Sequence, residues 1–400
     1  MPINCEVHFD SNPAKVVYAG QVLSGTCRLT STEHLNVRSI FIRIQGTAHA
    51  QWQEGTGEKS KTFTGDEDYL NERTYFVNRS TFYAGGETRL LAGSYTYNFQ
   101  CMLPPGLPTS FEGEFGYIRY FTRVVIDIPL LPDQTFEQLF TVIKAVNLNA
   151  DPALQAPVIA EKSKTFSPVL LCCFTSSPPM TILARIPVGG YTPGQVINLE
   201  INVKNESDQP ASKFTIKLIK QVIYYVCENS TRQKHETIPI FEMETRGCDV
   251  GKEEDYRVNL EVPSIPPSNF STSNIIKVKY SIRIIGSVPC FHINPIIDLP
   301  ITIGTYPIQD ITPTATGYPH PTDMAINSVI LPPSVSQVFD QNNQLPYSAV
   351  PSAPSAPFPI PQDEPPSYME AMQSATIADS NNLTPKYPMY NQRTSYSNGN

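Results

Sequence analysis

Residues 276–284 alternate strictly between apolar and polar side chains, and this pattern constrains the fold more than any other feature of the chain. Successive side chains of a β-strand point to opposite faces of a sheet, so the alternation predicts a strand with one buried and one exposed face. Residues 40–45, 199–204 and 256–262 show the same alternation. No segment shows a long helical period. The chain is therefore predicted to be all-β, with many short strands that form antiparallel β-sandwiches.

An internal repeat divides the strand-rich region into two parts. The repeat predicts two homologous β-sandwiches in tandem, residues 1–155 and 165–306. Their connection is expected near residues 149–164, where prolines interrupt the strand pattern. Three pairs of segments recur in the same order, at offsets of about 160 to 174 residues: 18–23 with 191–197, 103–111 with 265–270, and 120–123 with 280–283.

The composition changes near residue 306. The final 95 residues hold 16 of the 38 prolines, and no Lys or Arg occurs between Arg283 and Lys386. Such a segment buries too little apolar area to offset its conformational entropy. Residues 307–400 are therefore predicted to form a disordered Pro-rich tail.

The charge and the motif content exclude several classes of function. The net charge of −8 lacks the basic balance that nucleic-acid binding requires, so no nucleic-acid partner is expected. The sequence has no HExxH, GxSxG or GxGxxG motif, its six histidines are dispersed, and its eight cysteines include no CxxC pair. The chain is predicted not to be an enzyme, with no catalytic residue, cofactor or metal site.

The sequence predicts a cytosolic protein. No apolar run approaches the roughly 20 residues that span a bilayer, and the polar start of the chain does not resemble a signal peptide. Association with membranes is therefore expected to be peripheral only. The cytosol keeps cysteines reduced, and the adjacent Cys172-Cys173 in an apolar run is interpreted as a pair of buried thiols.

The tail contains the sequence Pro365-Pro366-Ser367-Tyr368, a PPxY motif. A proline pair presets the polyproline II helix, which docks on aromatic grooves with little entropy left to lose, and WW domains bind this pattern. A WW domain needs two tryptophans, whereas this chain has only Trp52. The chain is therefore expected to carry the ligand, at Pro365, Pro366 and Tyr368, and to act as an adaptor.

Several separated motifs occur in order along the chain: the paired Y-x-x-G-Q-V segments, Gly106–Gly113, Gly116–Tyr120, Asn147–Asn149, Cys172-Cys173 and Gly190–Gln195. Together they resemble the α-arrestins, the arrestin domain-containing proteins, over roughly residues 5–305. The resemblance implies tandem arrestin-type, immunoglobulin-like sandwiches that recognise membrane-protein cargo such as receptors and transporters.

The resemblance also implies a cellular role. It implies that the tail recruits a HECT-type ubiquitin ligase through the ligase's WW domains. Cargo is then ubiquitinated, endocytosed and sorted into endosomes. The protein is expected in the cytoplasm, with recruitment to the plasma membrane and endosomes.

The tail departs from the family pattern, in which two PPxY motifs are common. Only the motif that ends at Tyr368 has both prolines. The sequences Thr384–Tyr387 and Tyr387–Tyr390 keep only the second one. We expect this degenerate pair to contribute little to WW binding, and a lone motif to bind in the micromolar range, roughly −7 to −8 kcal/mol.

Two alternative partners follow from other motifs. Pro351-Ser352-Ala353-Pro354 overlaps Pro354-Ser355-Ala356-Pro357, and both are similar to the P(S/T)AP peptide that ESCRT-I binds, which predicts a budding or vesicle-release adaptor. One α-arrestin relative binds thioredoxin through a cysteine of its second domain. Cys248 lies in a similar loop-like region, which makes it the candidate redox thiol.

Basic side chains are the candidates for contact with a phosphorylated cargo segment or anionic lipid. These candidates are Lys15, Arg43, Arg119 and Arg123. A separate hypothesis concerns modification of the adaptor itself. Because the only lysine after residue 279 is Lys386, ubiquitin is expected mainly on the sandwiches.

Overall fold

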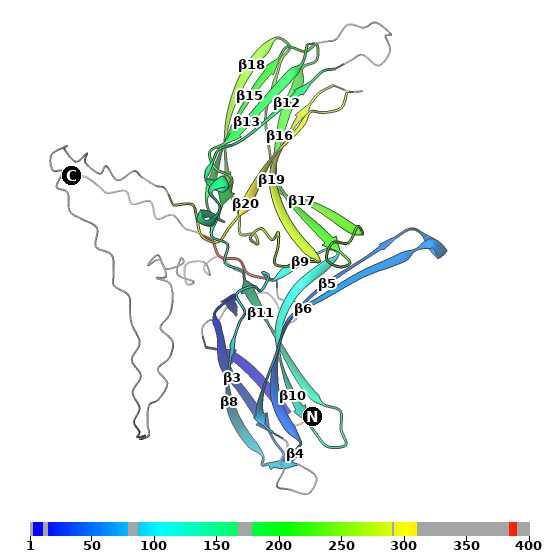
Figure 1. Cartoon of the computed structure of the whole chain (residues 1–400), viewed down its shortest axis with the longest axis vertical. Coiled ribbons are helices and arrows are strands. Elements are labelled where there is room, and N and C mark those ends of the chain that lie inside the picture. Colours follow the sequence, from blue (N-terminus) through cyan, green and yellow to red (C-terminus); the bar gives the residue numbers. More distant parts are fainter. Residues whose placement is uncertain are drawn as a thin grey trace, which may run out of the picture. The chain divides into compact units, whose positions relative to one another are not determined.

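A computed structural model describes residues 3–10, 15–78, 87–166, 178–289, 292–309 and 384–389. Within these ranges the chain forms twenty β-strands and three short 3-10 helices, arranged as two sandwiches (Figure 1). The all-β prediction is confirmed, and the four alternating segments lie in strands, except that Val262 comes one residue after its strand ends. The PPxY motif, the PSAP motifs and Cys172-Cys173 lie outside the described residues.

The first sandwich packs a sheet of order β1-β3-β8 against a sheet of order β2-β11-β10-β5-β6, in which β9 pairs with β10; β4 and β7 form a separate pair. Strands pair antiparallel except β2, which runs parallel to β11. Figure 1 shows β5 and β6 as a long hairpin that extends beyond the rest of the sheet. The elements are β1 (Ile3–Phe9), β2 (Val16–Tyr18), β3 (Val22–Ser31), β4 (Leu35–Val37), β5 (Ser39–Glu54), η1 (Gly57–Lys59), β6 (Lys61–Val77), β7 (Thr88–Leu90), β8 (Gly93–Met102), β9 (Phe111–Gly113), β10 (Gly116–Asp127) and β11 (Gln134–Ile143).

The second sandwich repeats this arrangement. A sheet of order β12-β13-β15-β18 packs against a sheet of order β14-β20-β19-β16-β17, and β14 again runs parallel to its partner, β20. The short helices η2 (Leu148–Ala150) and η3 (Pro152–Gln155) lie in the connection. The strands are β12 (Val158–Lys164), β13 (Met180–Ile186), β14 (Gly190–Tyr191), β15 (Val196–Asn205), β16 (Ala211–Tyr225), β17 (Gln233–Cys248), β18 (Lys252–Glu261), β19 (Ile276–Ser287) and β20 (Ile296–Ile303).

Apolar side chains from the alternating strands form the core. A buried tyrosine occupies the same place in the central strand of each sandwich. The hydroxyl of Tyr120 donates to the carbonyl oxygen of Pro108, and the hydroxyl of Tyr280 donates to the carbonyl oxygen of Pro266, both at 2.7 Å. Each bond satisfies a polar group that would be costly to bury alone. The buried apolar side chains of both sandwiches form one contiguous cluster, so the sandwiches pack directly on each other.

Two segments differ from what the sequence predicts. Strand β12 pairs with β13 along its whole length, so the second sandwich includes Val158–Lys164, residues expected in the connection. Residues Thr384–Met389 lie against the sandwiches with defined contacts, although they fall within the tail that is predicted to be disordered. Residues 307–309 are also described, and the side-chain amide of Asn149 donates to the carbonyl oxygen of Pro307. Residues 310–383 and 390–400 of the predicted tail lie outside the described ranges. Among the described residues, no helix is both long and apolar enough to cross a membrane.

Candidate functional site

Three arginines lie side by side across the outer face of the first sandwich. In the pairing register, Arg123 of β10 is opposite Arg43 of β5, and Arg43 is opposite Arg73 of β6. Glu137 of β11 lies opposite Arg123 on the other side. Directly paired residues of neighbouring strands point to the same face of a sheet, so these four side chains share one face. We call Glu137, Arg123, Arg43 and Arg73 the arginine row.

The arginine row carries an unbalanced positive charge. Arg123 Nη2 lies 2.8 Å from Glu137 Oε2, which makes one ion pair. Arg43 Nε donates to the neutral amide oxygen of Asn71 at 2.7 Å. Within the described part of the chain, Arg43 and Arg73 have no carboxylate partner. Three positive charges against one negative charge leave the row at +2.

Aromatic rings hold the guanidinium groups in place. The guanidinium carbon of Arg73 lies 4.6 Å from the ring centroid of Phe41, and that of Arg123 lies 5.0 Å from the ring centroid of Phe121. Stacking of this kind leaves N–H groups at the edge of the guanidinium plane free to bind an anion. The rings therefore restrict the arginine side chains without using their hydrogen-bonding capacity.

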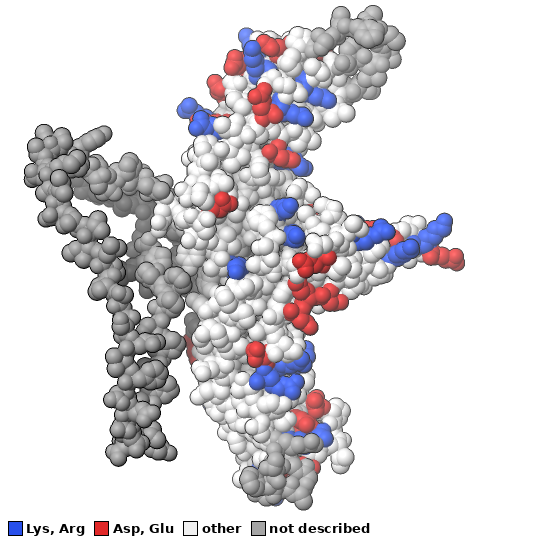
Figure 2. Space-filling model, in the orientation of Figure 1, with Lys and Arg blue, Asp and Glu red and all other residues white. Residues whose placement is uncertain are grey.

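The second sandwich has the same row with balanced charge. There Arg283 of β19 is opposite Lys217 of β16 and Asp298 of β20, and Lys217 is opposite Glu242 of β17. Lys217 pairs with Glu242 and Arg283 with Asp298, each at 2.8 Å. Glu242 is the counterpart of Arg73, so the sign of one edge-strand residue accounts for the difference between the two rows. Figure 2 shows a group of basic side chains over the part of the first sandwich where β5, β6 and β10 run.

This charge difference makes the arginine row a candidate site for an anion. Like charges that face each other across strands are destabilising, and the second sandwich offsets this cost with Asp298 and Glu242, one on each side of its two basic residues. In the first sandwich the cost remains, and an anionic ligand would remove it. Arginine is the side chain best suited to bidentate recognition of carboxylate or phosphate groups.

The other two basic candidates lie elsewhere. Arg119 donates through Nε and Nη2 to both carboxylate oxygens of Glu112, at 2.7 and 2.9 Å, so its charge is already balanced. Lys15 is half-buried outside the arginine row, and burial, with the charge of Lys386, lowers the pKa of its ammonium group. The sequence therefore identified two members of the row, Arg43 and Arg123, and missed Arg73. Residues 71–74 are all polar and 75–77 all apolar or aromatic, so no two-residue alternation in this segment could have placed Arg73 on the outer face.

A carboxylate holds the two sandwiches together at a second site. Glu67 of β6 accepts hydrogen bonds from the backbone N–H and the side-chain amide of Asn274, at 3.0 and 2.6 Å. It also accepts from the hydroxyls of Ser273 and Tyr69. Burial, with the bond to Glu67, raises the pKa of Tyr69, so its hydroxyl stays protonated. Glu67 therefore links the β5–β6 hairpin to the second sandwich.

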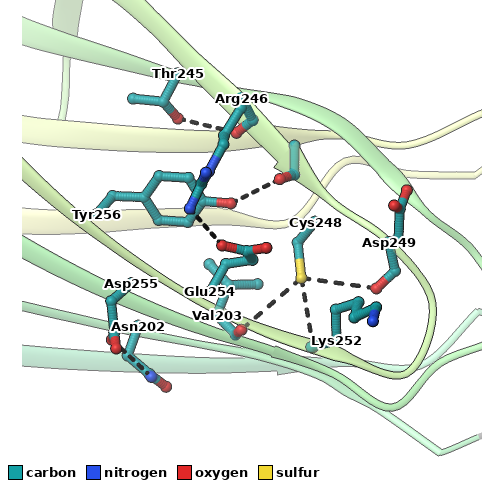
Figure 3. Close-up of polar contacts among 11 residues, drawn as sticks. Asn202, Val203, Thr245, Arg246, Cys248, Asp249, Lys252, Glu254, Asp255 and Tyr256 are labelled. Atoms are coloured by element: carbon teal, nitrogen blue, oxygen red, sulfur yellow. Dashed lines mark hydrogen bonds and ion pairs between the residues drawn. The ribbon is translucent and has the colours of Figure 1, made fainter.

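Cys248 is a core residue rather than a loop thiol. It is the last residue of β17 and is 1% exposed. Figure 3 shows its sulfur among backbone atoms, with the carbonyl oxygens of Val203, Asp249 and Lys252 at 3.9, 3.7 and 3.4 Å. Burial raises the pKa of the thiol, and the charge of Glu254 raises it further. This environment corrects the expectation of a loop thiol, because a redox-active cysteine needs access and a lowered pKa.

A different pair of thiols lies close together. Cys5 of β1 and Cys27 of β3 have sulfur atoms 3.3 Å apart, a proximity that follows from the strand register and not from their spacing in the sequence. Among the described residues, no group of three or more metal-ligating side chains is assembled. The expected binding residues Pro365, Pro366 and Tyr368 and those at 351–357 lie outside the described ranges.

Comparison with known proteins identifies the family that has this architecture. The model of the arrestin (S-antigen) N-terminal domain matches residues 5–149, and that of the arrestin C-terminal domain matches residues 176–308. Arrestin domain-containing protein 17 of Caenorhabditis elegans is 29% identical over 312 residues, which cover 74% of this chain and 69% of the relative. The chain belongs to the α-arrestins.

Other relatives of this α-arrestin match over the same share of the chain. The mouse and human arrestin domain-containing protein 1 are 26% and 27% identical over 297 residues, 74% of this chain. The match spans 63% of the length of these two relatives. Arrestin-domain proteins act as adaptors, and the sandwiches that carry this match are those that hold the arginine row and Glu67.

Proposed function

We propose that this α-arrestin is an adaptor whose arginine row binds an acidic or phosphorylated segment of membrane-protein cargo. The unbalanced charge of the row is the observation that supports the proposal, because the equivalent row of the second sandwich is neutral. Neighbouring strands lie about 4.8 Å apart, so three arginines abreast reach anionic groups over roughly 10 Å. A segment with several phosphates or carboxylates matches this spacing.

The second half of the proposed function is recruitment of a ubiquitin ligase. Pro365, Pro366 and Tyr368 form the PPxY ligand for the WW domains of a HECT-type ligase. Cargo bound at the arginine row is then ubiquitinated, endocytosed and sorted through endosomes. The adaptor works at the cytosolic face of the plasma membrane and endosomes, and any reactive cysteine of ubiquitin transfer belongs to the ligase.

Cargo recognition is tested by charge reversal in the full chain. The probe is an immobilised peptide with phosphoserine at alternate positions, compared with its unphosphorylated form. We expect Arg73→Glu to weaken binding of the phosphorylated form at least about tenfold, which corresponds to ~1.4 kcal/mol. Arg257→Glu is the matched control, because it reverses the charge of an exposed arginine of the second sandwich that lies outside either row. Equal binding by the wild-type chain and Arg73→Glu would rule out the arginine row as the cargo site.

Ligase recruitment is tested by affinity purification from cells. The wild-type chain is compared with the Pro366→Ala/Tyr368→Ala variant, and the partners are identified by mass spectrometry. We expect a HECT-type ligase to be lost from the variant while other partners remain. Ligase present in equal amounts in both samples, or absent from both, would exclude the PPxY motif as the recruiting site.

ESCRT-I binding stays a prediction from the PSAP motifs. Pro354 belongs to both overlapping copies, so Pro354→Ala changes both with one substitution. In the same purification this variant is expected to lose ESCRT-I and keep the ligase. Retention of ESCRT-I by Pro354→Ala would exclude the motif.

A further inference from the structure

Residues Thr384–Met389 lie at the junction of the two sandwiches, where Figure 1 draws them in red. The hydroxyl of Tyr387 donates to the carbonyl oxygen of Ser110 in the first sandwich at 2.9 Å. The hydroxyl of Ser264 in the second sandwich donates to the backbone carbonyl oxygen of Tyr387 at 2.7 Å. One tyrosine of the tail is therefore bonded to both sandwiches.

The surface under this segment is a groove with walls from both sandwiches. Pro385 lies in a hollow lined by residues of β10, β11 and the loop before β9, including Leu139 and Thr141. Pro388 and Met389 lie in a second hollow, lined by Tyr18 of β2 and by Pro193 and other residues of the second sandwich. Tyr387 also lines the second hollow, so Pro385, Tyr387, Pro388 and Met389 all border the two hollows.

The repeat explains why the groove exists. Each sandwich holds its short parallel edge strand, β2 or β14, next to a serine that bonds twice to the neighbouring strand. Ser110 exchanges two hydrogen bonds with Val142, and Ser268 exchanges two with Ile303. These equivalent edges face the same junction. The groove is thus a product of the duplication, and the tail segment lies in it.

The groove keeps unused polar capacity. The hydroxyls of Thr141 and Thr192, one in each hollow, are buried and have no hydrogen-bond partner in the described part of the chain. Both residues are 1% exposed. Buried hydroxyls usually find a partner, so each hollow keeps one hydroxyl with which a bound group could form a hydrogen bond.

Charge does not hold the segment in place. Lys386 lies close enough to Lys15 to lower the pKa of the Lys15 ammonium group, which is a repulsive contact. Burial raises the pKa of Tyr387, so its hydroxyl remains a hydrogen-bond donor. The burial of Tyr387 and its two hydrogen bonds must therefore supply the attraction.

We propose that the groove between the sandwiches is a binding site for a Tyr-Pro peptide, and that Thr384–Met389 occupies it within the same chain. The occupant is bonded at Tyr387, and the chain leaves the second sandwich at Gln309. In the sequence, residues 310–383, which include the PPxY and PSAP motifs, connect Gln309 to this segment.

The contact to Ser110 also defines which peptides the groove rejects. The carbonyl oxygen of Ser110 accepts a hydrogen bond, so the ligand must present a hydroxyl donor there. A phosphorylated tyrosine has no such donor, and it brings negative charge toward the carbonyl oxygen of Ser110. The carboxylate of Glu112 is also near, since its charge raises the pKa of Tyr387, and it would repel the phosphate. The groove is therefore specific for the unmodified tyrosine.

Competition by a fluorescent peptide of residues 381–393 tests the proposal on the full chain. Binding is measured by fluorescence polarisation, and it involves neither cargo nor ligase. We expect the peptide to bind the Tyr387→Ala chain at least about tenfold more tightly than the wild-type chain, whose own tail competes at high effective concentration. Tyr396→Ala, another tail tyrosine, is the matched control and should behave as the wild-type chain does.

Two further arms of the experiment locate the site. In the Tyr387→Ala background, the exposed Ser264→Arg change is expected to abolish peptide binding, and the peptide phosphorylated at Tyr387 is expected not to bind. Equal peptide affinity of the wild-type and Tyr387→Ala chains would overturn the proposal. The proposal would also be overturned if competition by the wild-type tail increased with protein concentration. The occupant of the groove would then be the tail of a second copy.

Discussion

At the scale of single residues, burial decides the chemistry that a side chain can perform. Cys248 and Cys227 are both free thiols of the second sandwich, but Cys248 is buried and Cys227 is exposed. The buried thiol lies among carbonyl oxygens and has a raised pKa, so at neutral pH it is protonated. The thioredoxin-binding alternative requires a reactive Cys248, and the structure gives it no support.

The accessibility of Cys248 can be measured directly. We expect iodoacetamide to alkylate Cys248 of the native chain at least about tenfold more slowly than Cys227, because the thiolate is the reactive form and burial restricts access. Peptide mapping by mass spectrometry after timed labelling gives both rates. Labelling in denaturant is the control, since both thiols are then exposed. Comparable native rates would show that Cys248 is reactive after all.

At the scale of elements, a close approach between strands fixes the packing of the first sandwich. Gly46 of β5 is opposite Tyr120 of β10, and a Cβ atom at Gly46 would lie 2.4 Å from the tyrosine ring. The ring needs this space to reach the carbonyl oxygen of Pro108. Glycine is therefore required at this position, on the inner face of the sheet whose outer face carries the arginine row.

A pair of glycine substitutions tests this packing. Gly46→Val is expected to lower the free energy of unfolding by about 1–3 kcal/mol, because the tyrosine must move and its hydrogen bond is lost. Gly106→Ala is the control, since a Cβ atom there meets nothing within 4 Å. Chemical denaturation of both variants gives the comparison. A Gly46→Val chain as stable as the wild type would mean that the strands can separate without cost.

At the scale of the whole molecule, contacts between the sandwiches connect the strand that carries Arg73 to the second sandwich. Glu67 is on β6, the strand that carries Arg73, and it bonds to Ser273 and Asn274 of the second sandwich. The tail segment at Tyr387 adds a second bridge between the sandwiches. The hypothesis that ubiquitin is attached mainly to the sandwiches stays a prediction, with Lys386 half-buried in the docked segment.

The hydrogen bonds of Glu67 should stabilise the packing of the two sandwiches against each other. Glu67→Ala leaves the donors of Ser273 and Asn274 without their charged acceptor, which is expected to cost about 1–3 kcal/mol of unfolding free energy. We also expect the two sandwiches to unfold less cooperatively in this variant. Fluorescence of Trp52 reports on the first sandwich and circular dichroism on both, so the two unfolding curves should separate. Glu58→Ala, at an exposed position of η1, is the control. Unfolding curves of Glu67→Ala that match the control would remove Glu67 from the coupling.

The sequence alone determined the class of fold, because a period of two residues is a local property of each strand. Residues 276–284 fall in β19 and residues 40–45 in β5, as predicted. The recurrence of 120–123 at 280–283 was also readable, and these segments lie in equivalent central strands. The family resemblance rested on other local motifs, among them Gly106–Gly113 and Gly190–Gln195.

Only the tertiary structure decided which distant residues meet. Arg43, Arg73 and Arg123 become one row through strand register, which depends on pairing between segments 30 or more residues apart. The burial of Cys248 depends on its neighbours across the sheet, and the contacts of Tyr387 join it to residues more than 120 positions away. A local pattern carries no information about such contacts, because they arise only when the separate strands are packed into one core.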